Sequence, residues 1–183
     1  MKPFIKYIAL SALLATTGAY AALDAGTEAP DFSALASLGG EGFEFNLAES
    51  LEQGPVVVYF YPKAFTSGCT IEARMFAEAT DEFAQYDTSV IGVSTDDIET
   101  LHEFSVSECS SKFPVASDED GNVVAAYDAA MANGMAARIS YVIVPGGEII
   151  HVLEDRAPEG HIHESMEAVK AWSASNNHSD HNH

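Results

Sequence analysis

The sequence has few cysteines, few basic residues and, after its first two dozen positions, no long apolar segment. It contains two cysteines, Cys69 and Cys109, which excludes a framework of several disulfides. Eight Lys and Arg residues stand against 28 Asp and Glu residues, so the net charge is −20. Phosphate backbones repel such a chain, and we expect no binding to nucleic acid. Beyond the N-terminal segment, no stretch is long and apolar enough to predict a transmembrane helix.

Residues 1–21 have the pattern of a signal peptide. Lys2 and Lys6 form a positive start, a short apolar core follows, and Ala19-Tyr20-Ala21 matches a cleavage signal. An uncleaved membrane anchor is the alternative interpretation. With cleavage after this signal, we expect an exported, periplasmic protein that has no stable association with the membrane. The mature chain would keep six basic and 28 acidic residues, a net charge of −22.

Residues 22–175 have the length of one domain with one sizeable core. Residues 176–183 follow as a polar tail that contains His178, His181 and His183. A His-rich tract can bind transition metals, but the tail lacks a spaced set of carboxylates or thiols that would complete a defined site. We therefore interpret the tail as disordered and solvated.

The pattern of apolar residues predicts strands that alternate with helices. The predicted strands are Phe43–Phe45, Val56–Phe60, Ser89–Ser94, Ser140–Val144 and Glu148–Leu153. The predicted helices are Leu47–Leu51, Ile71–Tyr86, Asp97–Cys109, Val123–Tyr127 and His163–Ala174. Strands that a helix connects should be parallel, whereas the last two strands form an antiparallel hairpin. This order predicts an α/β fold with a central mixed β-sheet flanked by helices.

Cys69 lies at the predicted turn between the strand Val56–Phe60 and the helix Ile71–Tyr86. The first N–H groups of a helix have no partners within the helix, and this end carries a partial positive charge. Both effects favour the thiolate, which is the nucleophilic form of cysteine. The alternative for two cysteines in an exported protein is a structural disulfide. The context of Cys69 and the large apolar content argue against that alternative.

The segment around Cys69 resembles the peroxiredoxins. Pro62, Thr66 and Cys69 match the P-x-x-x-T/S-x-x-C signature of that family, and residues 63–73 are most similar to its bacterioferritin comigratory protein (peroxiredoxin Q) branch. Three further segments match family motifs in the same order: Ala29–Phe32, Asp118–Tyr127 and Arg138–Ile143. The resemblance covers nearly the whole mature chain and implies a thioredoxin-like fold.

The resemblance implies a role for each matched residue. Cys69 would attack a peroxide oxygen and become a sulfenic acid. The Thr66 hydroxyl can both accept from the thiol and donate to the peroxide. Arg138 would stabilise the thiolate and hold the peroxide oxygens. Pro62 would shape the loop and shield the thiolate from water, and Glu72 would help to orient the arginine.

The sequence departs from the resembled branch at one position. Many members carry a second cysteine five residues after the first, where this chain has Arg74. Some relatives place the resolving cysteine in the following helix, so the resemblance implies a Cys69–Cys109 disulfide that forms after local unwinding. The alternative is a one-cysteine enzyme whose sulfenic acid is reduced directly by a small thiol or a partner.

These observations predict a thiol-dependent peroxidase that acts on hydrogen peroxide and organic hydroperoxides. It would need no metal, haem or flavin, and it would be reduced by a thioredoxin-like dithiol protein. We expect a monomer or weak dimer. A thiol–disulfide oxidoreductase would need C-x-x-C, but the third residue after Cys69 is Glu72. A copper-delivery protein would need C-x-x-x-C, but the fourth is Ala73.

Overall fold

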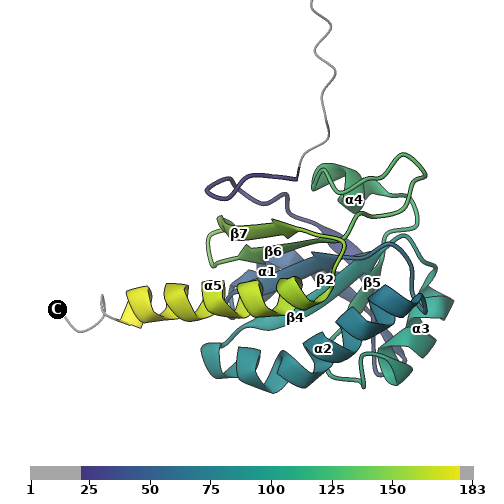
Figure 1. Ribbon diagram of the computed structural model, residues 1–183, viewed down its shortest axis with the longest axis horizontal. Coiled ribbons are helices and arrows are strands. Elements are labelled where there is room, and N and C mark those ends of the chain that lie inside the picture. Colours follow the sequence, from purple (N-terminus) through teal and green to yellow (C-terminus); the bar gives the residue numbers. More distant parts are fainter. Residues whose placement is uncertain (1–21, 178–183) are drawn as a thin grey trace, which may run out of the picture.

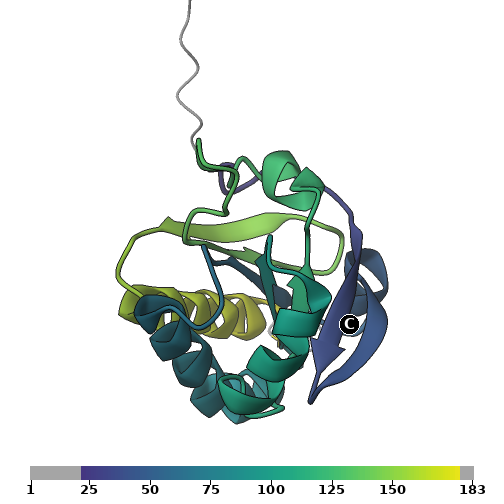
Figure 2. The same ribbon diagram turned by 90° about the vertical axis from the view of Figure 1, so that its right-hand side faces the viewer.

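The structure, a computed structural model, describes residues 22–177. Its centre is a seven-stranded mixed sheet with helices on both faces (Figures 1 and 2). This arrangement confirms the predicted α/β fold. The predicted signal peptide (1–21) lies outside the described residues, as does all of the predicted tail after its first two positions.

The order of the strands across the sheet is β2-β1-β5-β4-β3-β6-β7. The strands are β1 (Ser33–Leu38), β2 (Glu41–Asn46), β3 (Val56–Phe60), β4 (Ser89–Ser94), β5 (Val115–Ser117), β6 (Ile139–Ile143) and β7 (Ile149–Glu154). The helices are α1 (Leu47–Leu51), α2 (Ser67–Phe83), α3 (Ile98–Ser107), α4 (Asn122–Ala126) and α5 (Glu159–Asn177), and a 3₁₀ helix, η1 (Ala84–Tyr86), follows α2. Strand β4 pairs in parallel with β3 and β5, and the other neighbouring pairs are antiparallel.

Strand β3 lies inside the sheet, and all five of its apolar residues are buried. Both faces of such a strand are covered, which explains a continuous apolar run instead of an alternating one. Val56, Val58 and Phe60 pack in the cluster that includes α1 and α4. Val57 and Tyr59 pack in the opposite cluster, with α2, α3 and α5. Figure 1 shows these last three helices together on one side of the sheet.

An aromatic layer fixes α2 against this face of the sheet. Phe76 of α2 is fully buried, and its ring stacks on that of Tyr59 with centroids 4.4 Å apart. Phe113 packs edge-on against both rings, at interplanar angles of 66° and 67°. On the outer side of α2, Ile71 is 48% exposed. Rigid packing of α2 on β3 determines where the first turn of the helix lies, and therefore where Cys69 lies.

The structure differs from the sequence prediction in several elements, including β1, α2 and α5. Strand β1 was not predicted because Ser and Ala supply most of its residues, and its pairing with both β2 and β5 overrides that weak local preference. Helix α5 begins at Glu159 and ends at Asn177, so Asn176 and Asn177 are helical and do not belong to a disordered tail. Helix α2 begins before Ile71, as described below. Across residues 22–177, no helix has the length and apolar character needed to span a bilayer.

Candidate active site

The segment between β3 and α2 places Cys69 in the first turn of the helix. Thr66 takes the N-cap position with an extended backbone (φ −79°, ψ 151°), and α2 begins at Ser67. The helix therefore starts four residues before the predicted Ile71, and Cys69 lies inside it. The N–H groups of this turn lack carbonyl partners within the helix, and the helix dipole makes this end positive. The first-turn position keeps the electrostatic setting that the sequence indicated.

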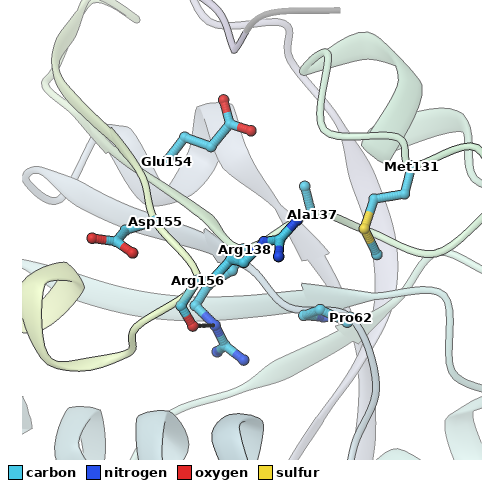
Figure 3. A pocket seen from close by; sticks show the side chains of 7 residues that line it. All are labelled: Pro62, Met131, Ala137, Arg138, Glu154, Asp155 and Arg156. Atoms are coloured by element: carbon cyan, nitrogen blue, oxygen red, sulfur yellow. Dashed lines mark hydrogen bonds between the residues drawn. The ribbon is translucent and has the colours of Figure 1, made fainter.

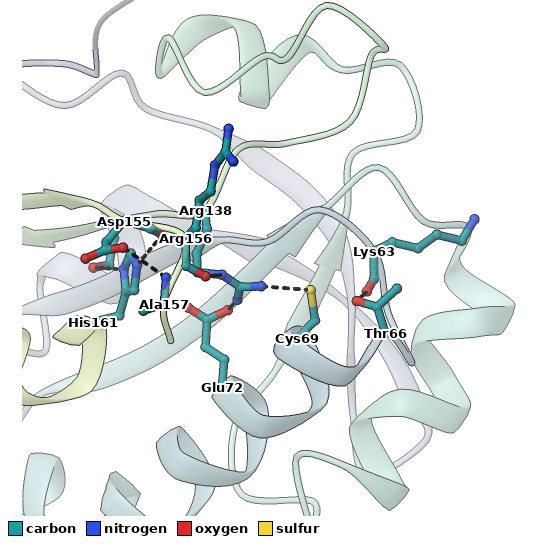
Figure 4. Close-up of polar contacts among 10 residues, drawn as sticks. Lys63, Thr66, Cys69, Glu72, Arg138, Asp155, Arg156, Ala157 and His161 are labelled. Atoms are coloured by element: carbon teal, nitrogen blue, oxygen red, sulfur yellow. Dashed lines mark hydrogen bonds and ion pairs between the residues drawn. The ribbon is translucent and has the colours of Figure 1, made fainter. Parts of the chain in front are cut away.

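Arg138, the residue directly before β6, approaches Cys69 from beside α2 (Figure 4). Strands β3 and β6 pair antiparallel with Phe60 opposite Ile139, so Arg138 emerges beside the end of β3. Its Nη2 donates to the Sγ atom of Cys69 over 3.4 Å. Cys69 is only 2% exposed. The guanidinium therefore places a positive charge beside a sulfur that little water reaches.

Each nitrogen of the Arg138 guanidinium binds a different group. Nε donates to the main-chain carbonyl of Arg156 over 3.1 Å, and Nη1 forms an ion pair with Oε2 of Glu72. Nη2 is the nitrogen that contacts Cys69. The Arg138 side chain is 8% exposed. With three directional contacts in a nearly dry setting, the guanidinium has one orientation.

Glu72 lies one turn after Cys69 on the same face of α2, which is the position that the resemblance predicted for orienting the arginine. Its side chain is fully buried, and its Oε1 atom has no hydrogen-bond partner among the described residues. Burial raises the pKa of Glu72 to about 8, although the charge of Arg138 and its hydrogen bond act in the opposite direction. The carboxyl therefore changes its charge near neutral pH instead of at ordinary acidic values.

Thr66 and Pro62 also come close to the site, but Thr66 points elsewhere. Its hydroxyl is exposed and donates to the main-chain carbonyl of Lys63 over 2.8 Å. No hydrogen bond between Thr66 and Cys69 is present in the described part of the chain. The Oγ1 lone pairs remain able to accept, whereas donation to a peroxide requires rotation of the side chain. Pro62 lines the cavity described next.

A cavity of about 730 Å³ opens beside Arg138 (Figure 3). It is lined by Pro62, Met131, Ala137, Arg138, Glu154, Asp155 and Arg156. Apolar and charged groups both contribute to this wall. The sequence analysis identified Pro62 and Arg138 but none of the other residues. They come from the loop before β6, from the last residue of β7 and from the segment after it, so only the folded chain brings them together.

Cys109 and Cys69 are both free thiols and belong to the same buried cluster on the α2 side of the sheet. Cys109 lies two residues beyond the end of α3, whereas the predicted helix included it. It is fully buried. Burial, and then the negative charge of Glu108, raise the pKa of Cys109 far above its usual range. The two free thiols disagree with the alternative of a permanent structural disulfide.

An ion pair joins α2 to the end of α3 close to Cys109. Nη2 of Arg74 lies 2.7 Å from Oε2 of Glu108. Arg74 occupies the position where many members of the resembled branch carry their second cysteine.

Among the described residues, no group of three or more His, Cys, Asp or Glu side chains is arranged to hold a metal ion.

Comparisons with known proteins agree with this geometry. The family model described as AhpC/TSA matches residues 25–152. The chain is 36% identical over 146 residues to peroxiredoxin Bcp of Escherichia coli, an alignment that covers 76% of this chain and 90% of that one. It is 32% identical over 154 residues to a putative peroxiredoxin bcp of Helicobacter pylori, with 80% and 98% covered.

A solved structure, peroxidoxin BcpB from Mycobacterium tuberculosis, is similar with a TM-score of 0.73 and 28% identity. The match covers 80% of this chain and 96% of that one. Sequence, fold and the arrangement of Arg138 around Cys69 therefore agree, and the chain belongs to the AhpC/TSA family of peroxiredoxins.

Proposed function

We propose that Cys69 is the residue that attacks peroxide in this thiol peroxidase, and that Arg138 is its main electrostatic partner. The observation that carries the proposal is the contact between Nη2 of Arg138 and Sγ of Cys69 in the first turn of α2. The substrates are hydrogen peroxide and organic hydroperoxides. The thiolate supplies the electrons, so the reaction needs no metal, haem or flavin.

The chemical step balances without a further reactant. The Cys69 thiolate attacks the terminal peroxide oxygen, the O–O bond breaks, and the sulfur becomes a sulfenic acid. The leaving oxygen takes up a proton and departs as water or an alcohol. Negative charge moves from the sulfur to the leaving oxygen in this step. Arg138 and the N–H groups at the start of α2 are fixed donors that stabilise this charge without reorganising.

The cavity beside Arg138 supports entry of substrates larger than hydrogen peroxide. Its volume of about 730 Å³ lies in the range of sites for small organic molecules. Met131 and Ala137 offer apolar contacts for an organic group, and Arg138, which contacts the Cys69 sulfur, lines the same cavity. Thr66 joins the site when its hydroxyl turns away from the carbonyl of Lys63.

We also propose that Cys109 resolves the sulfenic acid. Attack of the Cys109 sulfur on Cys69 would form a disulfide and release water. The step requires local opening, because Cys109 is fully buried and its pKa is strongly raised. The segment after it supports such opening: Ser110 and Ser111 both have positive φ, at 51° and 55°. A residue other than glycine in this left-handed backbone conformation costs on the order of 1–2 kcal/mol. Two such residues in a row favour local unfolding of the segment.

The cycle closes when an external dithiol reduces the disulfide, and we propose a thioredoxin-like protein for this role. Export to the periplasm is part of the same proposal and is supported by the pattern of residues 1–21. Our expectation of a monomer or weak dimer stays a prediction.

Substitution of the two central residues tests the first step. Cys69→Ser should abolish the fast reaction with hydrogen peroxide, and Arg138→Ala should slow it about 10²–10³-fold, as for loss of one fixed donor to a developing anion. Stopped-flow mixing of the reduced protein with peroxide measures the rate. Arg74→Ala is the control, because it removes another arginine at α2 and should leave this step unchanged. Fast oxidation of Cys69→Ser would exclude the assigned nucleophile.

Peptide mapping tests the role of Cys109. After one equivalent of hydrogen peroxide, the wild-type protein should lose both thiols and yield a Cys69–Cys109 disulfide peptide in non-reducing mass spectrometry. Cys109→Ser should stop at the sulfenic acid, which a sulfenic-acid trapping reagent can detect. Cys69→Ser, as the control, should keep Cys109 reduced. A wild-type protein that loses one thiol and forms no such peptide would instead be a one-cysteine peroxidase.

The raised pKa of Glu72 predicts a specific dependence of stability on pH. The unfolded carboxyl ionises near its ordinary value of 4.5 and the folded one near 8. The folded state therefore holds one more proton between these values, and the contribution of Glu72 to the free energy of unfolding falls as pH rises from about 4.5 to 8. Urea unfolding measures the free energy of unfolding of wild type and of Glu72→Gln. The value for wild type minus the value for Glu72→Gln should fall as pH rises across this window.

Glu78→Gln is the control for this experiment, since Glu78 is exposed on the same helix. Its difference from wild type should not change between pH 4.5 and 8. A constant difference for Glu72→Gln would show that Glu72 ionises in the folded protein at its ordinary pH.

Expression of the full chain in a bacterium tests export. The protein recovered from the periplasm should begin at Ala22 by N-terminal sequencing, because cleavage follows Ala21. Replacing Ala19 and Ala21 by Lys should block processing, since the cleavage site requires small residues. A wild-type protein that remains in the cytoplasm with Met1 or Lys2 at its N-terminus would contradict the proposal.

A further inference from the structure

His161 is a buried histidine that the chemistry described above does not use. It lies in the first turn of α5 and is fully buried, whereas His163, two residues later, is exposed. Its Nδ1 lies 2.8 Å from Oγ of Ser140, and its Nε2 lies 3.0 Å from the main-chain carbonyl of Asp155. Figure 4 shows the ring next to the segment that reaches Arg138.

These two partners determine the protonation of the ring. The carbonyl of Asp155 can only accept, so Nε2 carries the hydrogen, and Nδ1 then accepts from the Ser140 hydroxyl. Burial lowers the pKa of His161, and the positive charge of Arg138 lowers it further, against the opposing hydrogen bond to Asp155. The neutral ring therefore satisfies both contacts, and it holds two parts of the chain together.

Both of these parts lead directly to Arg138. Ser140 is in β6, two residues after Arg138, and Asp155 precedes Arg156, whose carbonyl accepts from Arg138 Nε over 3.1 Å. Residues 155–157 are exposed, so little packing holds this segment in place. Its internal contact is a hydrogen bond from the Ala157 N–H to the Asp155 carboxylate, at 2.9 Å. Apart from the bond to Arg138 itself, the His161 contact is the hydrogen bond that ties this segment to the body of the protein in the described part of the chain.

We propose that His161 is a positioning residue that fixes the Arg156 carbonyl and thereby aims the Arg138 guanidinium at the Cys69 sulfur. The inference rests on the roles proposed above for Cys69 and Arg138. Without the His161 contact, the exposed segment can move, Nε of Arg138 loses a fixed acceptor, and the guanidinium gains alternative orientations. His161 acts through Arg138 and does not touch the substrate.

A double-mutant cycle separates this role from a general structural one. His161→Ala should slow the stopped-flow reaction of the reduced protein with hydrogen peroxide roughly 10- to 100-fold, the scale expected when an aligned group is misplaced. In an Arg138→Ala background the same substitution should cause no further loss, because residues that act as one unit are not additive. His161→Gln should restore much of the rate, since its amide N–H can reach the Asp155 carbonyl. His163→Ala is the matched control and should react like wild type.

Several results would overturn the inference. One is a wild-type rate in His161→Ala, and another is an equal loss with and without Arg138. Should His161→Ala fail to fold, Ser140→Ala tests the same connection and should also lose rate only when Arg138 is present. An unchanged rate in Ser140→Ala would then contradict the proposal. A wild-type protein no faster than Cys69→Ser would overturn the proposed function as well, whereas a fast wild type with an equally fast His161→Ala overturns this inference alone.

Discussion

The site depends on one buried cation. Arg138 is 8% exposed, and a guanidinium this far from water is tolerated only when fixed partners replace its hydration. Three parts of the chain meet here: Arg138 directly before β6, Cys69 and Glu72 in α2, and the Arg156 carbonyl in the segment after β7. These contacts both place a positive charge beside the Cys69 sulfur and hold the guanidinium in position. A change in any of the three segments alters the position of the charge relative to the sulfur.

The sheet makes this meeting of residues possible. Strand β3 leads into α2 and Cys69, while β6 follows Arg138, and the two strands are antiparallel neighbours. The end of one strand thus lies beside the start of the other. A shift of their register by one residue would turn Arg138 to the opposite face of the sheet. The buried apolar residues of β3, covered by helices on both faces, exclude such a shift because it would break both cores.

The sequence predicted the groups that carry a motif and missed those that depend on main-chain geometry. Cys69 and Arg138 were found by residue type and order, and the structure brings them together. The Arg156 contact uses a carbonyl that every residue possesses, so nothing in the sequence could indicate it. The rotamer of Thr66 depends on the nearby Lys63 carbonyl, and the partners of His161 are 6 and 21 positions away. Such contacts are fixed by tertiary structure and not by local pattern.

The environments of the two cysteines differ in the direction that the proposed order of reaction requires. Cys69 has a cation on its sulfur and the positive end of a helix around it, while Cys109 has a buried setting and the carboxylate of Glu108 nearby. Tyr59 belongs to the same buried cluster as both cysteines. Because burial raises the pKa of Cys109, its thiol is a poor competitor for peroxide while the fold is closed. In the proposed cycle, Cys69 is oxidised first, and local opening at the end of α3 then lets Cys109 reach it to form the disulfide.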